Sequence, residues 1–182
     1  MWRIVFTTSR HPTPPVRRLA RELSRLVYGG YRLNRGGLSE EELCVLAREH
    51  GAERVVIVGR GRGGNPGRIV FLECGERSPI RLPFVIGLRG VIFLGRAERS
   101  KDVTPIYSLG GCGYFCEELS MAFNIPYLGE YGEEVKGRVM LVEYIGKRLL
   151  AVIKFVEEGR EIGVKLLVNK AAVVRWQKDG SI

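Results

Sequence analysis

The residues best placed to do chemistry lie in a glycine- and arginine-rich segment, residues 59–68, that follows a predicted buried strand. The segment holds three arginines, Arg60, Arg62 and Arg68, together with Asn65. A flexible loop with guanidinium groups and many exposed amides is suited to gripping a nucleic-acid backbone, because phosphate oxygens accept hydrogen bonds from both. A solvated hairpin turn needs neither so many glycines nor three arginines. The composition therefore favours a binding loop.

The same glycines raise one alternative. Gly59, Gly61 and Gly64 satisfy the spacing of a dinucleotide-binding motif. That motif requires a helix to open at its third glycine, so that the helix N-terminus meets the pyrophosphate. Here Pro66 and Gly67 lead into another predicted strand, and the acidic ribose ligand is missing. An RNA- or nucleotide-acting enzyme that uses the loop 59–67 remains the alternative function.

Two further short segments place polar side chains where predicted strands end. The first closes a predicted strand over residues 3–8 and consists of Thr8, Ser9 and Arg10. Such groups can hold a phosphate at a helix N-terminus, at the carboxyl edge of a sheet, or they can simply cap the helix. The second is Arg32-Leu33-Asn34-Arg35-Gly36, a short predicted strand that leads into a turn, and its polar residues are Arg32, Asn34 and Arg35. Its alternative is an Asx turn with exposed arginines.

The helix predicted from Pro14 onward carries more arginines. Its aliphatic residues recur at helical spacing and define a buried face: Val16, Leu19, Leu23, Leu26 and Val27. At about 100° per residue, a stripe of arginines falls on the opposite face. The stripe consists of Arg17, Arg21 and Arg25, with Arg18 alongside. We expect these side chains to face solvent and to contact phosphates.

Strands and helices alternate along the first half of the chain. A capping box formed by Ser39 and Glu42 opens a second helix that stops at Gly51, and strands follow at residues 54–58 and 68–73. The predicted elements of the second half are a strand at 91–94, a loop of about 15 residues, a helix at 114–124 and strands at 138–144, 148–156, 161–168 and 172–176. This order predicts one α/β domain over residues 1–182.

Charge is unevenly distributed over the chain. The sequence has 29 basic and 20 acidic residues, for a formal charge of +9, and residues 1–70 contribute 13 arginines and only 6 glutamates. The planar guanidinium fork pairs bidentately with phosphate and stacks on bases, which favours RNA over a membrane surface. A thermophilic or arginine-biased proteome is the alternative explanation of composition alone.

Several classes of protein are disfavoured. No stretch is long and apolar enough to cross a bilayer, and the N-terminus does not read as a signal peptide, so we expect a cytoplasmic protein without membrane partners. The four cysteines predict reduced, buried thiols, and the spacing of Cys112 and Cys116 does not match a zinc knuckle. His11 and His50 lack a triad arrangement, and carboxylates do not cluster. We expect no metal, no cofactor and no catalysis.

Taken together, the order and spacing of three motifs resemble the Brix-domain family of ribosome-biogenesis proteins. The motifs are Thr8-Ser9-Arg10, Asn34-Arg35-Gly36 and Arg62-Gly63-Gly64-Asn65-Pro66. The last contains one glycine more than the family's Arg-Gly-Asn-Pro element. The resemblance is strongest over residues 4–95, and the chain length is similar to that of the short archaeal members.

The resemblance implies a fold and a role. The fold is a single Brix domain of two similar α/β halves, residues 1–90 and 91–182, each like the anticodon-binding domain of class IIa aminoacyl-tRNA synthetases. The role is non-catalytic binding of ribosomal RNA or pre-rRNA during processing and subunit assembly, with a guide RNA and other assembly proteins as further partners. A protein that mainly docks assembly factors is the competing hypothesis. The RNA-binding hypothesis requires Arg10, Arg35 and Arg62 to converge on one surface.

Overall fold

The computed structural model describes residues 3–76, 78–132, 134–146 and 149–173. Its helices and strands, in chain order, are β1 (Ile4–Thr8), α1 (Pro14–Leu26), β2 (Gly30–Arg32), α2 (Glu40–Glu49), β3 (Arg54–Arg60), β4 (Pro66–Cys74), β5 (Pro79–Phe93), β6 (Ile106–Leu109), α3 (Gly113–Phe123), β7 (Tyr127–Glu130), β8 (Arg138–Tyr144), β9 (Ala151–Glu157) and β10 (Arg160–Val173). A short 3₁₀ turn, Arg62–Gly64, lies between β3 and β4.

The strands form one ten-stranded sheet in the order β2-β1-β3-β4-β5-β10-β9-β8-β6-β7. Strand β1 pairs in parallel with β2 and β3, and β6 pairs in parallel with β7 and β8. The remaining pairs are antiparallel, with the long strands β5 and β10 at the centre. The order is therefore symmetric about the β5–β10 pair, and the pattern of the first five strands is repeated by the last five.

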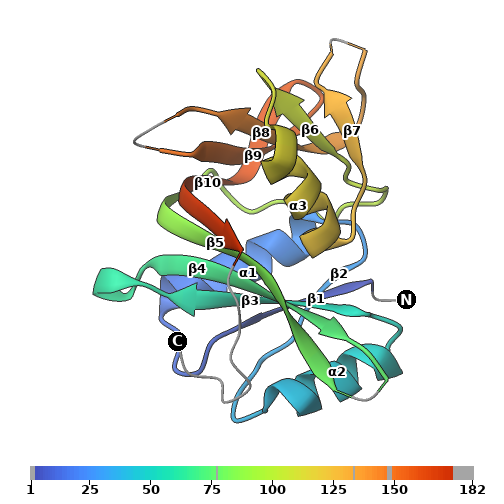
Figure 1. Cartoon of the computed structure of the whole chain (residues 1–182), viewed down its shortest axis with the longest axis vertical. Coiled ribbons are helices and arrows are strands. Elements are labelled where there is room, and N and C mark those ends of the chain that lie inside the picture. The colour runs from blue at the N-terminus through green and yellow to red at the C-terminus, as the bar shows by residue number, and fades with distance from the viewer. Residues whose placement is uncertain (1–2, 77, 133, 147–148, 174–182) are drawn as a thin grey trace.

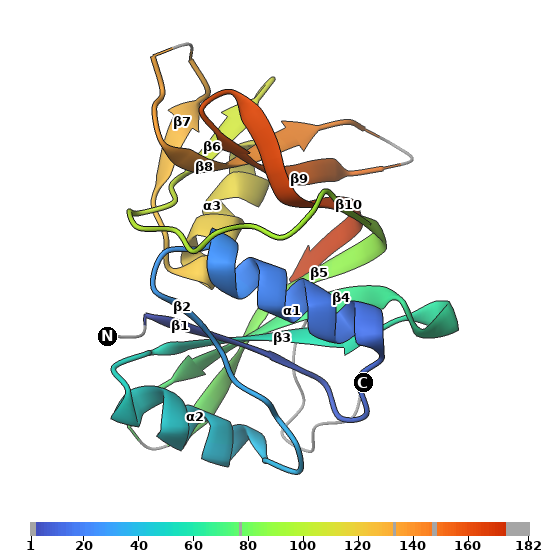
Figure 2. The same cartoon turned by 180° about the vertical axis from the view of Figure 1, so that it is seen from behind.

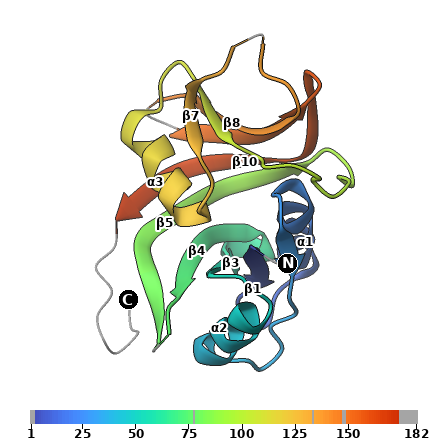
Figure 3. The ribbon, with the colours of Figure 1, turned by 90° about the vertical axis from the view of Figure 1, so that its right-hand side faces the viewer.

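Helices α1 and α3 pack on one face of this curved sheet and α2 on the other (Figures 1 and 3). The main core contains side chains from α1, α3 and strands of both ends of the sheet. Phe123 of α3 illustrates this, because its ring lies 5.0 Å edge-on from the ring of Phe71 in β4. A segment of residues 94–105 runs along α1 and connects the two repeats (Figure 2).

The predicted elements of the first half are found, with their order β-α-β-α-β-β. Helix α2 begins with the predicted capping box, in which the Ser39 hydroxyl accepts from the Glu42 backbone N–H at 3.2 Å and the Glu42 carboxylate accepts from the Ser39 N–H at 2.7 Å. Most of β5 was missed. The strand predicted at 91–94 corresponds only to the last part of this 15-residue strand.

The second half differs more from the prediction. The loop expected before α3 contains β6, and β7 was missed, because four-residue strands show too little alternation to be recognised. The turn expected at Asn169 is a bulge within β10. Of the strand expected at 172–176, residues 174–176 lie outside the described residues, as does Arg148. Strand β9 begins at Ala151.

The cysteines also differ from the prediction of reduced thiols. Cys44 of α2 is bonded to Cys74 of β4, and Cys112 is bonded to Cys116. Their Cα–Cα distances, 5.1 and 5.6 Å, lie in the range that a disulfide spans. The first pair is 30 residues apart in sequence and meets only because α2 packs on β4, which the sequence pattern did not reveal.

Candidate nucleic-acid interface

The three polar motifs follow the three parallel strands at one edge of the sheet. Because β2, β1 and β3 run in the same direction, their carboxyl ends meet at this edge. The register pairs Thr8 at the end of β1 with Val58 of β3, and Arg32 at the end of β2 with Phe6. The topology thus brings together segments that are more than 20 residues apart in the sequence.

A hollow of about 970 Å³, the edge pocket, lies at this edge. Its lining residues come from the segments after β1 and β2 and from the first turn of α1: Thr8, Ser9, Arg10, His11, Pro12, Arg17, Arg32, Asn34, Arg35, Gly36 and Gly37. Seven of these are residues that the sequence predicted to bind RNA. Four of them are arginines, and no carboxylate lines the pocket.

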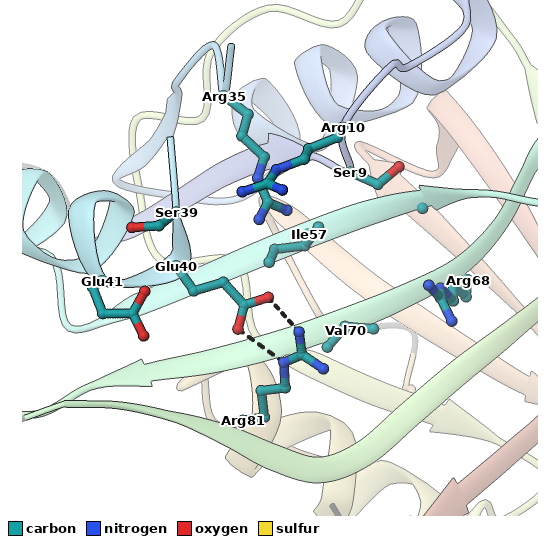
Figure 4. A pocket seen from close by; sticks show the side chains of 11 residues that line it. Ser9, Arg10, Arg35, Ser39, Glu40, Glu41, Ile57, Arg68, Val70 and Arg81 are labelled. Carbon is teal, nitrogen blue, oxygen red and sulfur yellow. Dashed lines mark hydrogen bonds and ion pairs between the residues drawn. The ribbon is translucent and has the colours of Figure 1, made fainter. Parts of the chain in front are cut away.

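A second hollow of about 570 Å³, the face pocket, adjoins the first and shares Ser9, Arg10 and Arg35 with it (Figure 4). It lies between the N-terminus of α2 and the sheet. Its other lining residues are Ser39, Glu40, Glu41, Ile57, Gly59, Arg68, Val70 and Arg81. We call Arg10, Arg17, Arg32, Arg35 and Arg68, which line the two pockets, the arginine cluster.

Acidic residues are present in the face pocket, but one of them is neutralised. Glu40 and Arg81 form a bidentate ion pair, with N–O distances of 2.7 and 2.8 Å (Figure 4). Hydrogen bonding to Glu40 raises the pKa of Arg81. Among the described residues, no member of the arginine cluster forms an ion pair of this kind. Their charges are therefore available to an external anion.

The guanidinium groups of Arg10 and Arg35 point toward one another in the face pocket (Figure 4). Burial lowers the pKa of Arg35, Glu40 opposes this shift, and the positive charges of Arg10 and Arg81 lower the pKa further. The Arg35 Nε atom is fixed by donating to the Leu38 carbonyl at 3.1 Å. Two like charges held together in this way favour a bound anion.

Arg32 is the most buried member of the cluster. Desolvation lowers its pKa, and the nearby charges of Arg21 and Arg17 lower it further. Its Nη1 atom donates to the carbonyls of Phe6, at 3.3 Å, and Leu33. The guanidinium group is therefore positioned by backbone carbonyls and not by a carboxylate, so its positive charge is not compensated.

The glycine-rich segment lines the face pocket only through its two ends, Gly59 and Arg68, and residues 60–67 lie next to the pockets without lining them. Its backbone closes through the Gly61 N–H, which donates to the Asn65 carbonyl at 2.7 Å, and the Thr13 hydroxyl donates to the Gly64 carbonyl. Arg60, Arg62 and Asn65 are exposed on it. Strand β4 begins at Pro66, so no helix opens after the third glycine and the dinucleotide-binding geometry is absent.

The start of α1 differs from the expected phosphate site. Pro14 and Pro15 occupy the first two helical positions and have no backbone N–H. The Thr13 side chain makes no capping hydrogen bond, because it is bonded to the glycine-rich loop instead. Side-chain groups, and not the helix N-terminus, are therefore the donors at this edge.

The stripe on α1 is only partly as predicted. Arg17, Arg18 and Arg21 are exposed. The Arg25 side chain is only 17% exposed and its Nη1 lies 3.3 Å from a carboxylate oxygen of the buried Glu22. The 94–105 segment covers this end of the helix and separates Arg25 from the arginine cluster. The helical periodicity of the sequence could not reveal this contact.

Arg81 is a residue of this region that the sequence did not reveal. It was missed because it lies in the part of β5 that showed no strand pattern, although its pairing with Glu40 shapes the face pocket.

Among the described residues, no three histidine, cysteine or acidic side chains gather as metal ligands. The helices described here are also too short or too polar to cross a membrane.

Comparisons with known proteins identify relatives of this chain in sequence and in structure. No protein-family model matches it. Among curated proteins it is similar to a probable Brix domain-containing ribosomal biogenesis protein of Aeropyrum pernix, with 42% identity over 82 residues. This alignment covers 44% of the chain and 45% of the relative, so the matched sequence spans less than half the length of that relative.

The similarity in structure is more extensive. The crystal structure of a probable ribosomal biogenesis protein from Aeropyrum pernix superposes with a TM-score of 0.79 and 27% identity, covering 93% of this chain and 97% of the other. Mil, an archaeal Imp4-like protein, superposes with a TM-score of 0.72 and 25% identity, covering 93% and 99%. The chain thus has the mixed α/β fold of these proteins, with one large sheet and few helices. The resemblance to the Brix-domain family of ribosome-biogenesis proteins is confirmed.

Proposed function

We propose that this chain is a ribosome-biogenesis factor that binds ribosomal RNA through the arginine cluster and catalyses no reaction itself. The observation that carries the proposal is that five arginines from three separate segments and α1 line two adjoining pockets at one edge of the sheet. None of the five is paired with a carboxylate among the described residues. Phosphate groups at successive positions of an RNA strand are suitable counter-charges.

The glycine-rich loop extends this surface. Arg60 and Arg62 are exposed on a loop that is tethered to the start of α1 through Thr13, next to residues of the edge pocket. The loop therefore adds guanidinium groups beside the cluster. This geometry supports the prediction that Arg10, Arg35 and Arg62 act on one RNA surface.

The relatives support the biological role. Those similar in sequence and structure are named as ribosomal biogenesis or Imp4-like proteins. The proposal includes pre-rRNA, a guide RNA and other assembly proteins as partners, and action in the cytoplasm. It also includes one Brix domain, residues 1–182, with halves 1–90 and 91–182 each related to the anticodon-binding domain of class IIa synthetases.

The salt dependence of RNA binding tests the proposal. If about five phosphates are neutralised, log affinity for a labelled single-stranded oligouridine should fall with log salt with a slope of about −3.5. Arg35→Ala should make the slope less negative by about 0.7. Arg160→Ala is the matched control, because Arg160 is an exposed arginine at the start of β10, next to the turn that follows β9 and far from the cluster. Equal affinity and slope for both variants and the wild type would refute RNA binding by the cluster.

Two other outcomes identify the competing functions. Magnesium-dependent hydrolysis of RNA or nucleotide that is lost on mutation of a carboxylate would establish an enzyme. RNA affinity unchanged in the double variant Arg60→Ala, Arg62→Ala would indicate that the loop docks proteins and does not contact RNA. Crosslinking in cells, mapped on both the RNA and the protein, then identifies the RNA that is bound.

A further inference from the structure

The face of the sheet beside the arginine cluster carries two parallel rows of side chains across four strands. The first row follows the register Gly59–Arg68–Gly87–Lys170 through β3, β4, β5 and β10. The second lies two residues along each strand and consists of Ile57, Val70, Val85 and Ala172. Cross-strand partners point to the same side of a sheet, so each row lies on one face.

The first row alternates a cation with a glycine. A Cβ atom at Gly59 would lie 2.8 Å from Cγ of Arg68, and one at Gly87 would lie 2.7 Å from Cγ of Lys170. The methylenes of Arg68 and Lys170 therefore lie over the two glycines, close to the sheet. Both residues are exposed and neither forms an ion pair among the described residues.

The second row is apolar and accessible in its outer part. Ile57 is buried at the floor of the face pocket, Val70 and Val85 are half-buried, and Ala172 is exposed. The two rows are offset by two residues along each strand and therefore lie about 7 Å apart, and each row spans three strand spacings, or about 14 Å. An apolar row and a cationic row thus run side by side, starting in the face pocket and ending on β10.

We propose that this face is a track for a single strand of RNA that leaves the arginine cluster through the face pocket and crosses β4, β5 and β10. Phosphates lie along Arg68 and Lys170, and unpaired bases lie against Val70, Val85 and Ala172. This inference rests on the proposed function and specifies its substrate class. An apolar platform beside a cationic groove suits unpaired bases, because their flat faces are exposed only outside a duplex.

The shape of the face pocket also favours a single strand. It measures about 570 Å³ and is bounded by the first turn of α2 on one side and the sheet on the other. This is the size of a pocket for one small ligand, and a duplex cannot enter it. A duplex binds by shape through its exposed minor groove and phosphates, and it would leave the apolar row unused.

The test compares two labelled RNAs, an oligouridine and a hairpin whose duplex has the same number of nucleotides, by fluorescence anisotropy over a salt series. The variants are Lys170→Ala for the cationic row and Val85→Asp for the apolar row, with Lys101→Ala as the control for an exposed lysine elsewhere. Lys101 lies next to Ser100, whose N–H bonds to Arg25 in the last turn of α1, so it is at the far end of that helix from the cluster. Thermal unfolding verifies that each variant is folded, and Ala172→Glu replaces Val85→Asp if that variant is not.

We expect Lys170→Ala to make the oligouridine slope less negative by about 0.7. Val85→Asp should weaken oligouridine binding by about fivefold or more, because it removes an apolar contact and adds a charge of the same sign as the phosphates. Hairpin binding and the control should be unchanged. The track is overturned if both variants bind oligouridine as the wild type does while Arg35→Ala is weakened, an outcome that leaves the proposed function intact. It is also overturned if the two variants lose hairpin binding to the same extent as oligouridine binding. If Arg35→Ala is unaffected as well, the proposed function itself fails.

Discussion

Arg138 provides a quantitative test of how the two repeats of the sheet are held together. It is the first residue of β8, its side chain is 5% exposed, and it pairs bidentately with Glu157 at 2.9 and 3.1 Å. Its Nη1 atom also donates to the carbonyl of Arg25, in the last turn of α1, at 3.2 Å, and to that of Glu98 at 2.8 Å. The side chain therefore joins the second repeat to the helix of the first.

Arg54 occupies the equivalent position in the first repeat, as the first residue of β3. It is paired in register with Glu73, as Arg138 is with Glu157, and it donates to the carbonyl of Met121 in the last turn of α3. These contacts are poorer, at 3.7 Å to the Glu73 carboxylate and 3.4 Å to Met121. Its buried Nε and Nη1 atoms have no hydrogen-bond partner. The same substitution can therefore be made at two equivalent arginines, Arg138 with well-formed hydrogen bonds and Arg54 with buried donors that lack a partner.

Replacing Arg138 with Met removes four good hydrogen bonds and leaves Glu157 unpaired. Breaking a buried ion pair by removing one partner costs roughly 3 to 5 kcal/mol. Because Glu157 is 40% exposed and can be solvated, we expect the lower end of that range, about 3 kcal/mol. Arg54→Met should cost about 1 kcal/mol or less, since the loss of weak contacts is offset by the removal of unsatisfied buried donors.

Thermal unfolding measured by circular dichroism distinguishes these expectations. For a domain of this size, a change of 1 kcal/mol shifts the Tm by roughly 2 to 4 °C. Arg138→Met should therefore lower the Tm by roughly 6 to 12 °C, and Arg54→Met by less than about 4 °C. If Arg54→Met lowers the Tm as much as Arg138→Met or more, the number and quality of an arginine's hydrogen bonds do not determine how much it stabilises this protein.

Two further predictions concern the first repeat. The Cys44–Cys74 disulfide closes a loop of 30 residues, so reduction should lower the free energy of unfolding by about 3 to 4 kcal/mol, and alkylation of the denatured, unreduced protein should label neither thiol. The pKa of Glu42 is lowered from 4.5 because its carboxylate accepts from the Ser39 N–H. The folded pKa is the lower one, so this contribution is complete above about pH 4.5 and is lost as the pH falls through the folded value. Glu42→Gln should weaken the loss of Tm on acidification, and an unchanged pH profile would contradict this.

The sequence predicted those features that depend on local pattern. The capping box at Ser39 and the apolar face of α1 both follow from residues within a turn or two of each other. The gathering of Arg10 and Arg35 was also predictable, because each lies just beyond a predicted strand of an α/β sheet, where the carboxyl ends of strands usually form the ligand-binding edge. Local pattern could not show that Arg25 is covered by the 94–105 segment, that Cys44 meets Cys74, or that Lys170 lies in register with Gly87. Each of these depends on contacts between residues far apart in sequence.

The repeat within the sheet gives an internal comparison for the candidate site. Strands β1, β2 and β3 and strands β6, β7 and β8 form the same parallel arrangement, so both ends of the sheet present a carboxyl edge. In the first repeat, each of the connections after these strands contains an arginine and no acidic residue. In the second, the connections after β6 and β7 hold one lysine and two glutamates, and only the one after β8 is basic, through Lys147 and Arg148, which lie outside the described residues.

The topology therefore does not by itself produce an arginine cluster. If the fold required positive charge at a carboxyl edge, the edge formed by β6 and β7 would carry it too. The concentration of arginines in the first repeat is instead a property of this site, added to a scaffold that is used twice. This asymmetry argues against a general bias toward arginine for solubility, because such a bias would act on the exposed connections of both repeats alike.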